Sequence, residues 1–237
     1  MTDKILYEGK AKVVFATDDP NVVRLYYKDD ATAFNGVKKG TIDGKGYYNN
    51  AISEILFKLI EEAGVPTQLI ERTSEREMLA HTLKMIPLEV VVRNVAAGSA
   101  SKRLGIPEGT PFKRPTLEFF YKDDDLGDPL VNEYHIFNLM EISSEDLELL
   151  GIYTFKVNDA VRPFLLERGI RLIDFKVEYG YDNEGRIRLG DELSPDSCRF
   201  WDAETNEKMD KDRFRRDLGD IEAFYAEVLR RVSNPPA

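Results

Sequence analysis

Apolar and charged residues alternate most regularly in residues 173–180, which read IDFKVEYG. Successive side chains of a β-strand point to opposite faces, so Asp174, Lys176 and Glu178 would share one face of a strand. The opposite face is apolar. An alternating strand is most often half exposed, in which case its charged face contacts water. The alternative is that this face lines a reaction site.

Apolar residues at helical spacing predict a helix over residues 47–64, which ends at a glycine, and a long helix over 143–168. Ser143 or Ser144 would cap the long helix. Pro163 is expected to bend this helix or to begin a new segment, because proline removes a backbone donor.

Strand patterns fill much of the remaining chain. A β-hairpin is predicted over residues 4–28, followed by a polar, glycine-rich loop over 29–46. The other predicted strands cover residues 67–72, 77–83, 88–95, 114–122, 169–180 and 186–193. The pattern indicates an α+β fold with antiparallel sheets and flanking helices, divided into a small N-terminal lobe (1–85) and a larger lobe (86–237).

Composition narrows the function. The 237 residues are 42% hydrophobic, which is enough for a substantial core, and the formal net charge is −10. An acidic protein is a poor partner for nucleic acid or for a membrane surface, so neither is expected. The N-terminus does not resemble a signal peptide, and no apolar run approaches the length of a membrane span.

The cysteine and histidine counts bear on redox environment and metals. Cys198 is the only cysteine, which excludes an intrachain disulfide and favours a reducing cytoplasm. Two histidines and one cysteine cannot build a standard zinc site. An essential metal is therefore expected to be a hard cation such as Mg²⁺, held by carboxylates and phosphates.

The first candidate site is the sequence EGKAKVVF, in which Lys10 and Lys12 lie two residues apart. In a strand both ammonium groups point the same way, and Gly9 lets the backbone approach a ligand closely. Two lysines beside a glycine turn suit a triphosphate. The alternative is a solvated lysine pair on an edge strand.

The second candidate is IPLEVVVRNVAAGSASKRLG, where Arg93 ends a buried-looking strand and Gly98 and Ser99 begin a short helix. Free N–H groups at a helix start, a hydroxyl and a guanidinium together suit a phosphate monoester. The alternative is a plain Ser99 cap with Arg93 on the surface.

The third candidate is RLGDELSPDSCRFWD. Asp191 and Glu192 end a predicted strand, and Asp196 and Arg199 follow. Taken alone, this stretch fits a polar loop with an Asp turn. However, the strand before it should pair antiparallel with residues 169–180, which would bring its acids toward those of that strand. Such a cluster is unfavourable without cations, and Mg²⁺ and Lys176 would supply them.

The C-terminal region, residues 211–232, predicts a helix. Its start, KMDKDRFRRDLG, is typical of a solvated helix beginning capped by Asp210 or Asp212.

These motifs resemble those of one known family. IPLEVVVRNVAAGS (86–99) and LIDFKVEYG (172–180) are similar to the two signature motifs of SAICAR synthetases. LYEGKAK (6–12), GDELSPDSCRFWD (190–202) and MDKDRFR (209–215) also resemble that family, in the same order. The resemblance extends over nearly the whole chain.

The resemblance implies a ligase of purine biosynthesis that forms SAICAR, ADP and phosphate from ATP, L-aspartate and a carboxylated aminoimidazole ribonucleotide (CAIR). It implies two α+β lobes related to ATP-grasp and kinase-like folds, with ATP bound in the cleft by the first lobe. It also implies Mg²⁺ and a homodimer.

The resemblance assigns the following expected roles. The ATP-binding residues are Lys10, Lys12, Lys84, Met85, Glu178 and Asp191. Glu178 and Asp191 would also hold the metal, and the adenine would stack near residues 83–86. The substrate-binding residues are Arg93, Ser99, Lys176 and Arg199, and the catalytic residues are Lys176 and Asp174. The loop 35–46 resembles the region near the aspartate substrate.

One position departs from the family pattern. Some relatives have Asp-Gly where this chain has Asn35-Gly36, so no metal role is carried over to Asn35. Cys198 is expected to be a small buried filler. Two rival functions stay open, namely a kinase-like phosphotransferase with another acceptor and a nucleotide-binding regulator without turnover.

Overall fold

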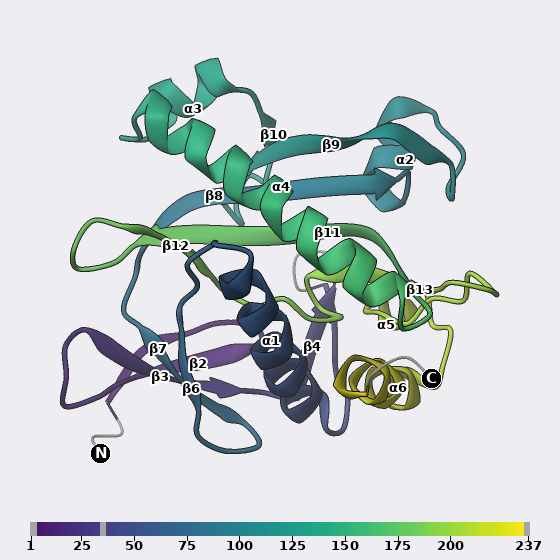
Figure 1. Ribbon diagram of the computed structural model, residues 1–237, viewed down its shortest axis with the longest axis horizontal. Coiled ribbons are helices and arrows are strands. Elements are labelled where there is room, and N and C mark those ends of the chain that lie inside the picture. The colour runs from purple at the N-terminus through teal and green to yellow at the C-terminus, as the bar shows by residue number, and fades with distance from the viewer. Residues whose placement is uncertain (1–3, 34–36, 235–237) are drawn as a thin grey trace.

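The computed structural model describes residues 4–33 and 37–234, and most of its strands form two antiparallel sheets (Figure 1). The first sheet has five strands, in the spatial order β1-β2-β3-β7-β6. Their bounds are β1 (Ile5–Glu8), β2 (Lys12–Ala16), β3 (Val22–Tyr27), β6 (Leu69–Arg72) and β7 (Glu77–His81). Because β2 lies inside this sheet, Lys12 is not on an edge strand.

The second sheet is built around two twelve-residue strands, β8 (Lys84–Val95) and β11 (Ile170–Tyr181). Its spatial order is β10-β9-β8-β11-β12, and β13 also pairs with β11. The remaining bounds are β9 (Pro111–Tyr121), β10 (Leu130–Val131), β12 (Ile187–Gly190) and β13 (Cys198–Asp202). The change of sheet between β7 and β8 comes close to the predicted lobe boundary at residue 85, which stays a prediction.

Helices cover these sheets. The bounds are α1 (Lys45–Glu62), α2 (Gly98–Leu104), α3 (Glu133–Leu139), α4 (Ser144–Leu166), α5 (Asp212–Arg215) and α6 (Ile221–Ser233). In Figure 1, α4 runs across β8 and β11, and α1 and α6 lie beside each other nearer the first sheet. The predicted α+β class with antiparallel sheets and flanking helices is confirmed.

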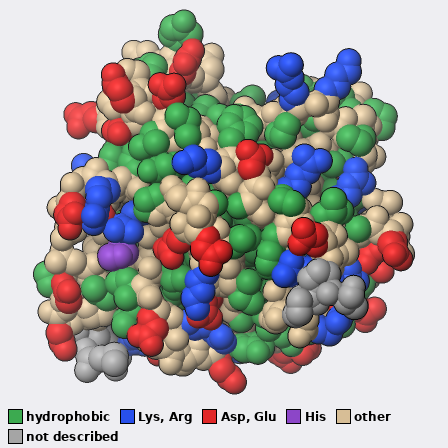
Figure 2. Space-filling view, viewed as in Figure 1, with side chains coloured by type: hydrophobic (Ala, Val, Ile, Leu, Met, Phe, Trp, Pro, Cys, Tyr) green, Lys and Arg blue, Asp and Glu red, His purple; other side chains and the backbone are tan. Residues whose placement is uncertain are grey.

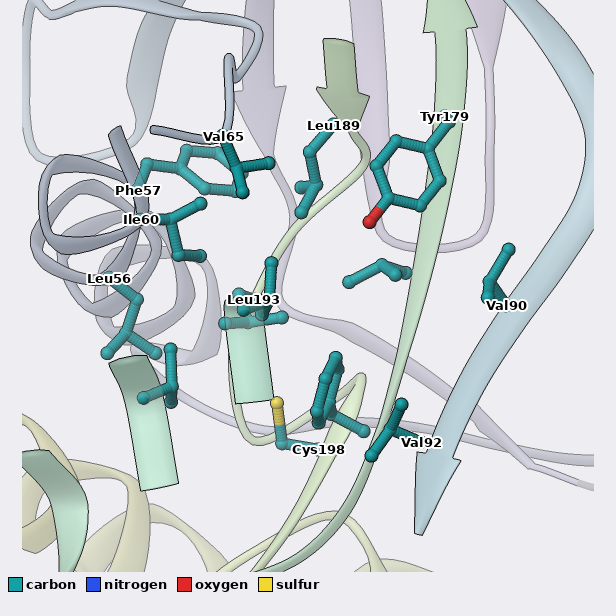
Figure 3. Packing of buried hydrophobic residues seen from close by; sticks show 14 of the residues in the cluster. Leu56, Phe57, Ile60, Val65, Val90, Val92, Tyr179, Leu189, Leu193 and Cys198 are labelled. Carbon is teal, nitrogen blue, oxygen red and sulfur yellow. The ribbon is translucent and has the colours of Figure 1, made fainter. Parts of the chain in front are cut away.

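One apolar core joins the two sheets. Leu56, Phe57 and Ile60 of α1 are fully buried, and Figure 3 shows them on the side of α1 that faces Leu189 and Tyr179 of the second sheet. At the same junction the backbone N–H of Leu189 donates to Pro66, and Gln68 donates back to Leu189, each at 2.8 Å. The two sheets are therefore held at a fixed separation on this side.

The long helix follows its prediction closely. Ser143 is the cap, since its Oγ accepts a hydrogen bond from the backbone N–H of Asp146 at 3.0 Å. The helix continues past Pro163 to Leu166, so the prediction of a new segment at Pro163 is wrong. This proline lies in the last turn, where only a few residues remain for it to disturb.

Two predictions about irregular segments are wrong. The predicted loop 29–46 contains a two-stranded hairpin, β4 (Asp30–Ala33) and β5 (Lys38–Thr41), and the first turn of α1. The predicted C-terminal helix is two helices, α5 and α6. They are separated at Gly219 and Asp220, whose φ angles of 72° and 50° lie in the left-handed region.

Charge on the outside is mixed. Figure 2 shows Lys, Arg, Asp and Glu side chains scattered among apolar ones on the face that carries α1 and α4. Within residues 4–33 and 37–234, none of the helices has the length and apolar character needed to cross a membrane.

Candidate active site

A cavity of about 590 Å³ receives side chains from both sheets. Lys12 of β2 belongs to its wall, together with residues of β8, β11 and β13. The site residues predicted from the sequence that line it are Lys10, Lys12, Met85, Arg93, Ser99, Asp174, Lys176, Glu178, Asp191 and Arg199. Lys84 is exposed and is missing from the described lining, so its expected contact with ATP stays a prediction.

The charged face of β11 forms the floor of this cavity. Asp174 and Glu178 are buried and Lys176 is half-buried, so the face lines a site and is not a solvated strand surface. In the register with β8, Asp174 lies opposite Arg93, and Glu178 lies opposite Glu89. Opposite residues of an antiparallel pair share a face, which brings these charges together.

Lys176 neutralises a facing pair of acids. Like charges directly opposite each other are destabilising, but Lys176 Nζ lies 2.7 Å from Glu89 and 3.2 Å from Glu178. Lys122 pairs with Glu178 as well. Burial would lower the pKa of Lys176, yet Glu178, Asp191 and Glu89 outweigh it and keep that pKa above its ordinary value. Lys176 therefore stays a cation in the cavity floor.

Asp191 reaches the same floor from the next strand. Gly190 pairs with Glu178, as the predicted antiparallel pairing requires, and Asp191 follows it. Lys12 forms ion pairs with Asp191 and, at 3.4 Å, with Glu192. Burial opposes ionisation of Asp191, but Lys12 and Lys176 hold its pKa below the usual range. The acid-rich end of the cavity is thus held together by lysines.

Glu178 and Asp191 fit the Mg²⁺ that the resemblance implies. Within the described parts of the chain, no group of three or more His, Cys, Asp or Glu side chains could hold a metal. Mg²⁺ commonly takes only one or two protein carboxylates and completes its shell with phosphate oxygens and water. The carboxylate of Glu178 on β11 and that of Asp191, directly after β12, supply that minimum.

A second group of cations lies around Asp174. Arg93 is only 4% exposed and donates to Asp174 at 2.8 Å and to Ser99 Oγ at 3.3 Å. Arg199 also donates to Asp174, at 2.9 Å. The alternative that Arg93 is a surface residue is therefore wrong. Ser99 is not the cap of α2 either, because Ala97 is the N-cap.

Gly98 explains how closely these groups can approach. Its φ of 54° is left-handed, and a Cβ at this position would collide with the guanidinium of Arg199. Glycine therefore lets Arg199 lie against the start of α2, beside Ser99 and Arg93. Asp174 orients both guanidiniums, which leaves a compact cationic pocket suited to a phosphate monoester.

Several cavity residues were missed in the sequence. Glu89 precedes Arg93 by four positions on one strand, so period two could have assigned it to the same face. Lys122 follows β9 directly and gave no local signal. Lys211, which precedes α5, and Arg215, its last residue, line the cavity from a stretch predicted to be solvated. Only tertiary packing brings these two cations into the site.

The predicted helix cap is also corrected. Asp210 and Asp212 are buried, and the N-cap of α5 is Lys211, without a side-chain cap. Asp210 accepts hydrogen bonds from the backbone N–H groups of Asp212 at 2.7 Å and Phe200 at 2.9 Å. It therefore ties α5 to β13 and does not face water.

Asp210 makes stability depend on pH. Burial and the neighbouring Asp212 raise its pKa to about 7. A carboxyl whose pKa is higher in the folded state keeps its proton there between about pH 4 and 7, so the free energy of unfolding falls as pH rises through this window. We expect a loss of about 2–4 kcal/mol between pH 5 and pH 8 from this group.

Urea unfolding of wild type and Asp210→Asn at both pH values tests this prediction. The variant should lose less stability between them, because its side chain does not ionise. Asp217→Asn is the matched control, since the side chain of Asp217 is 85% exposed. Equal pH slopes for wild type and Asp210→Asn would contradict the prediction.

Two remaining residues are resolved differently. Asn35 lies outside the described residues. Cys198 is a free, buried cysteine in the cavity wall, and burial raises the pKa of its thiol well above the usual range. It therefore stays a protonated, unreactive thiol, as expected of a small buried filler.

Comparison with known proteins decides the family. The family model described as SAICAR synthetase matches residues 5–232 of the 237. The chain belongs to the SAICAR synthetase family. The family resemblance predicted from the sequence motifs is therefore confirmed.

Relatives of this family match the chain over almost its full length. A phosphoribosylaminoimidazole-succinocarboxamide synthase from Clostridium beijerinckii is 54% identical over 97% of this chain and 98% of its own. The crystal structure of such a synthase from Ehrlichia chaffeensis has a TM-score of 0.95 at 43% identity, covering 99% of this chain and 100% of that one. A SAICAR synthetase in complex with ADP has a TM-score of 0.93 at 46% identity, covering 98% and 99%.

Proposed function

We propose that this chain joins L-aspartate to the carboxylate of CAIR at the expense of ATP, giving SAICAR, ADP and phosphate. The observation that carries the proposal is a single cavity with lysines among acids at one end and arginines at the other, the two ends being linked by one strand, β11. Lys12 belongs to one end, and Arg93 and Arg199 belong to the other. A phosphotransferase whose only phosphorylated substrate is ATP needs only the Lys12 end. Membership of the SAICAR synthetase family supports the same conclusion.

The nucleotide would bind at the Lys12 end. Lys10 and Lys12 would contact its phosphates, exchanging their present partners Asp124 and Asp191 for phosphate oxygens. A relative in complex with ADP supports binding of an adenine nucleotide by this chain. Glu178 and Asp191 would hold Mg²⁺, which when bound neutralises phosphate charge during transfer.

The ribonucleotide would bind at the Arg93 end. Its phosphate would contact Arg93, Ser99 and Arg199. Asp174 already holds both guanidiniums in place, and Arg93 also donates to Ser99. This anchor would align the CAIR carboxylate with the γ-phosphate, and alignment is the main requirement of phosphoryl transfer. Lys176 lies on β11 between the two ends, where it would stabilise the carboxylate as it approaches ATP.

The reaction then has two steps. A carboxylate is a poor acyl donor because oxide is a poor leaving group, so ATP phosphorylates the CAIR carboxylate to an acyl phosphate and releases ADP. The aspartate amine attacks the acyl carbon, forms the amide and expels phosphate. The amine's proton passes to Asp174 or to the departing phosphate.

Several finer features belong to this proposal. Lys84 and Met85 would contact the adenine near the junction of the two sheets, and the lobes would divide at residue 85. A homodimer, which the family resemblance implies, and a cytoplasmic location, which the single cysteine favours, complete the proposal.

An ADP-release assay with single omissions tests the function. Wild-type protein should release ADP repeatedly only when ATP, Mg²⁺, CAIR and aspartate are all present. If aspartate alone is omitted, it should release ADP in at most a single turnover. Repeated ADP formation that does not depend on aspartate would favour a kinase-like phosphotransferase. ATP binding without any turnover would favour a regulator. Chelating Mg²⁺ should abolish the signal, and added Mg²⁺ should restore it.

A further inference from the structure

Lys45 is a charged residue in a costly position behind the cavity. It is the first residue of α1, and its side chain is 0% exposed. Burying an ammonium group is unfavourable unless it is paired. The positive end of the helix dipole adds to this cost, because cations are disfavoured at helix N-termini. Lys45 is not among the residues that line the cavity, so substrate contact does not explain it.

The partner of Lys45 is Asp196, which does line the cavity. Asp196 Oδ2 accepts from Lys45 Nζ at 2.9 Å and from Lys211 Nζ at 3.4 Å. Its other oxygen, Oδ1, accepts from the hydroxyl of Tyr225 at 2.7 Å. Burial opposes ionisation, but Lys211 and Lys45 hold the pKa of Asp196 below its usual range. One carboxylate thus collects donors from α1, α6 and the residue that precedes α5.

Through Tyr225, α6 also donates a hydrogen bond to Asp196 in addition to covering the core. Its side chain is fully buried, and burial together with Asp196 raises the pKa of its hydroxyl. The hydroxyl therefore keeps its proton and remains a hydrogen-bond donor to Asp196. Hydrogen bonds to a charged, desolvated acceptor are among the stronger ones in proteins.

The loop that carries Asp196 is also hydrogen-bonded to β11 and to Lys211. The carbonyl of Ser197 accepts the backbone N–H of Lys176 at 2.9 Å, and the carbonyl of Pro195 accepts that of Lys211 at 3.0 Å. A shift of Asp196 would therefore also displace Lys211, whose ammonium group lies at the cavity wall.

Lys211 belongs to the ribonucleotide end of the cavity. It lies one turn before Arg215, which also lines the cavity. Arg215 and Arg199 share Asp212 as a partner, at 2.6 Å and 3.0 Å. The Lys211 side of the wall is therefore continuous with the cationic pocket around Arg199.

We propose that Lys45 and Tyr225 are positioning residues of the reaction, acting through Asp196 to hold Lys211 at the ribonucleotide end. This inference rests on the proposed function. Neither residue is among the described residues that line the cavity. Together they fix both oxygens of Asp196, so that its third donor, Lys211, has one orientation.

Tyr225→Phe tests the inference, because it removes one hydroxyl and little volume. We expect the KM for CAIR to rise about tenfold, as for the loss of one hydrogen bond to a charged group. The KM for ATP should stay within about twofold, because the hydroxyl of Tyr225 bonds to Asp196, whereas Lys12 pairs with Asp191 and Glu192. Lys45→Arg should raise the same KM selectively by displacing the other oxygen of Asp196.

Tyr179→Phe is the matched control. Tyr179 is also fully buried and shares a hydrogen bond of 2.9 Å with Thr154, but it lies on the apolar face of β11. Its loss should change thermal stability and leave every KM unchanged. If Tyr225→Phe also alters only stability, the inference is wrong.

A double-mutant cycle with Lys211→Met separates positioning from general loosening. In the Lys211→Met background, Tyr225→Phe should raise the KM for CAIR by less than about twofold, because the group it positions is gone. Full additivity, or an equal rise of the KM for ATP, would overturn the inference. Wild-type protein that releases no ADP would instead refute the proposed function, so the two failures are distinguishable.

Discussion

Replacing Lys176 with methionine should lower kcat by about 100- to 1,000-fold at saturating ATP, CAIR and aspartate, a loss typical of removing one preorganised electrostatic group. Lys176 is the cation that lies between Glu89 and Glu178 on the cavity floor. Its charge would be needed most when the anionic carboxylate of CAIR approaches the γ-phosphate. The loss should therefore appear in kcat and remain when substrate concentrations are raised.

The ADP-release assay measures this effect, and Lys58→Met is its control. Lys58 is 62% exposed and pairs with Glu54 on the outer side of α1, so its loss should leave kcat unchanged. Methionine keeps the length and apolar stem of lysine in both variants. Near-normal turnover of Lys176→Met with all substrates saturating would remove Lys176 from its central role.

The part of the site on β11 and β12 was predictable because its geometry is local. Period-two spacing assigned Asp174, Lys176 and Glu178 to one face. A short turn after β11 forced the next strand back antiparallel, and Gly190 pairs with Glu178 as a result. Asp191 then had to lie nearby. The charges were informative because like charges on adjacent strands require cations.

The strand β13 was not predictable in the same way. Pro195 and Asp196 indicate a turn, and Arg199 was expected in a polar loop. However, β12 covers only one end of the free edge of β11, leaving the end that begins at Ile170 without a partner. β13 fills this end and buries Phe200. β13 could be anticipated only from the unequal lengths of β11 and β12, and a local sequence pattern does not reveal this difference.

The hairpin β4–β5 and the cations at α5 were missed in the sequence for the same reason. Residues 29–46 are glycine-rich and polar, and β5 is largely exposed, so the hairpin has no alternating pattern to detect. It is held by a small cluster in which Ala31 and Ile42 pack against Phe214 of α5. A contact between residues so far apart in sequence also fixes the neighbouring Lys211 in the cavity wall.

The phosphate end of the cavity leads to a second large expected effect. Arg93→Lys should raise the KM for CAIR about 100-fold, because lysine keeps the charge but loses the planar fork of donors. Arg93 uses that fork for Asp174, Glu118 and Ser99 simultaneously. The three donors of an ammonium group share one nitrogen, so they cannot reach partners that Arg93 contacts from three separate nitrogens. The phosphate would then meet a cation without a fixed orientation.

Arg103→Lys separates this effect from the loss of an ion pair. Arg103 also pairs with Glu118 but is not among the described residues that line the cavity, so its replacement should leave the KM for CAIR unchanged. Urea unfolding should show Arg93→Lys to be less stable by about 1–3 kcal/mol, since Asp174 or Glu118 loses a buried donor. The KM for ATP should not move in either variant. A KM for CAIR that rises equally for Arg93→Lys and Arg103→Lys would mean that Arg93 only supports the sheet, and the phosphate would have to bind elsewhere in the cavity.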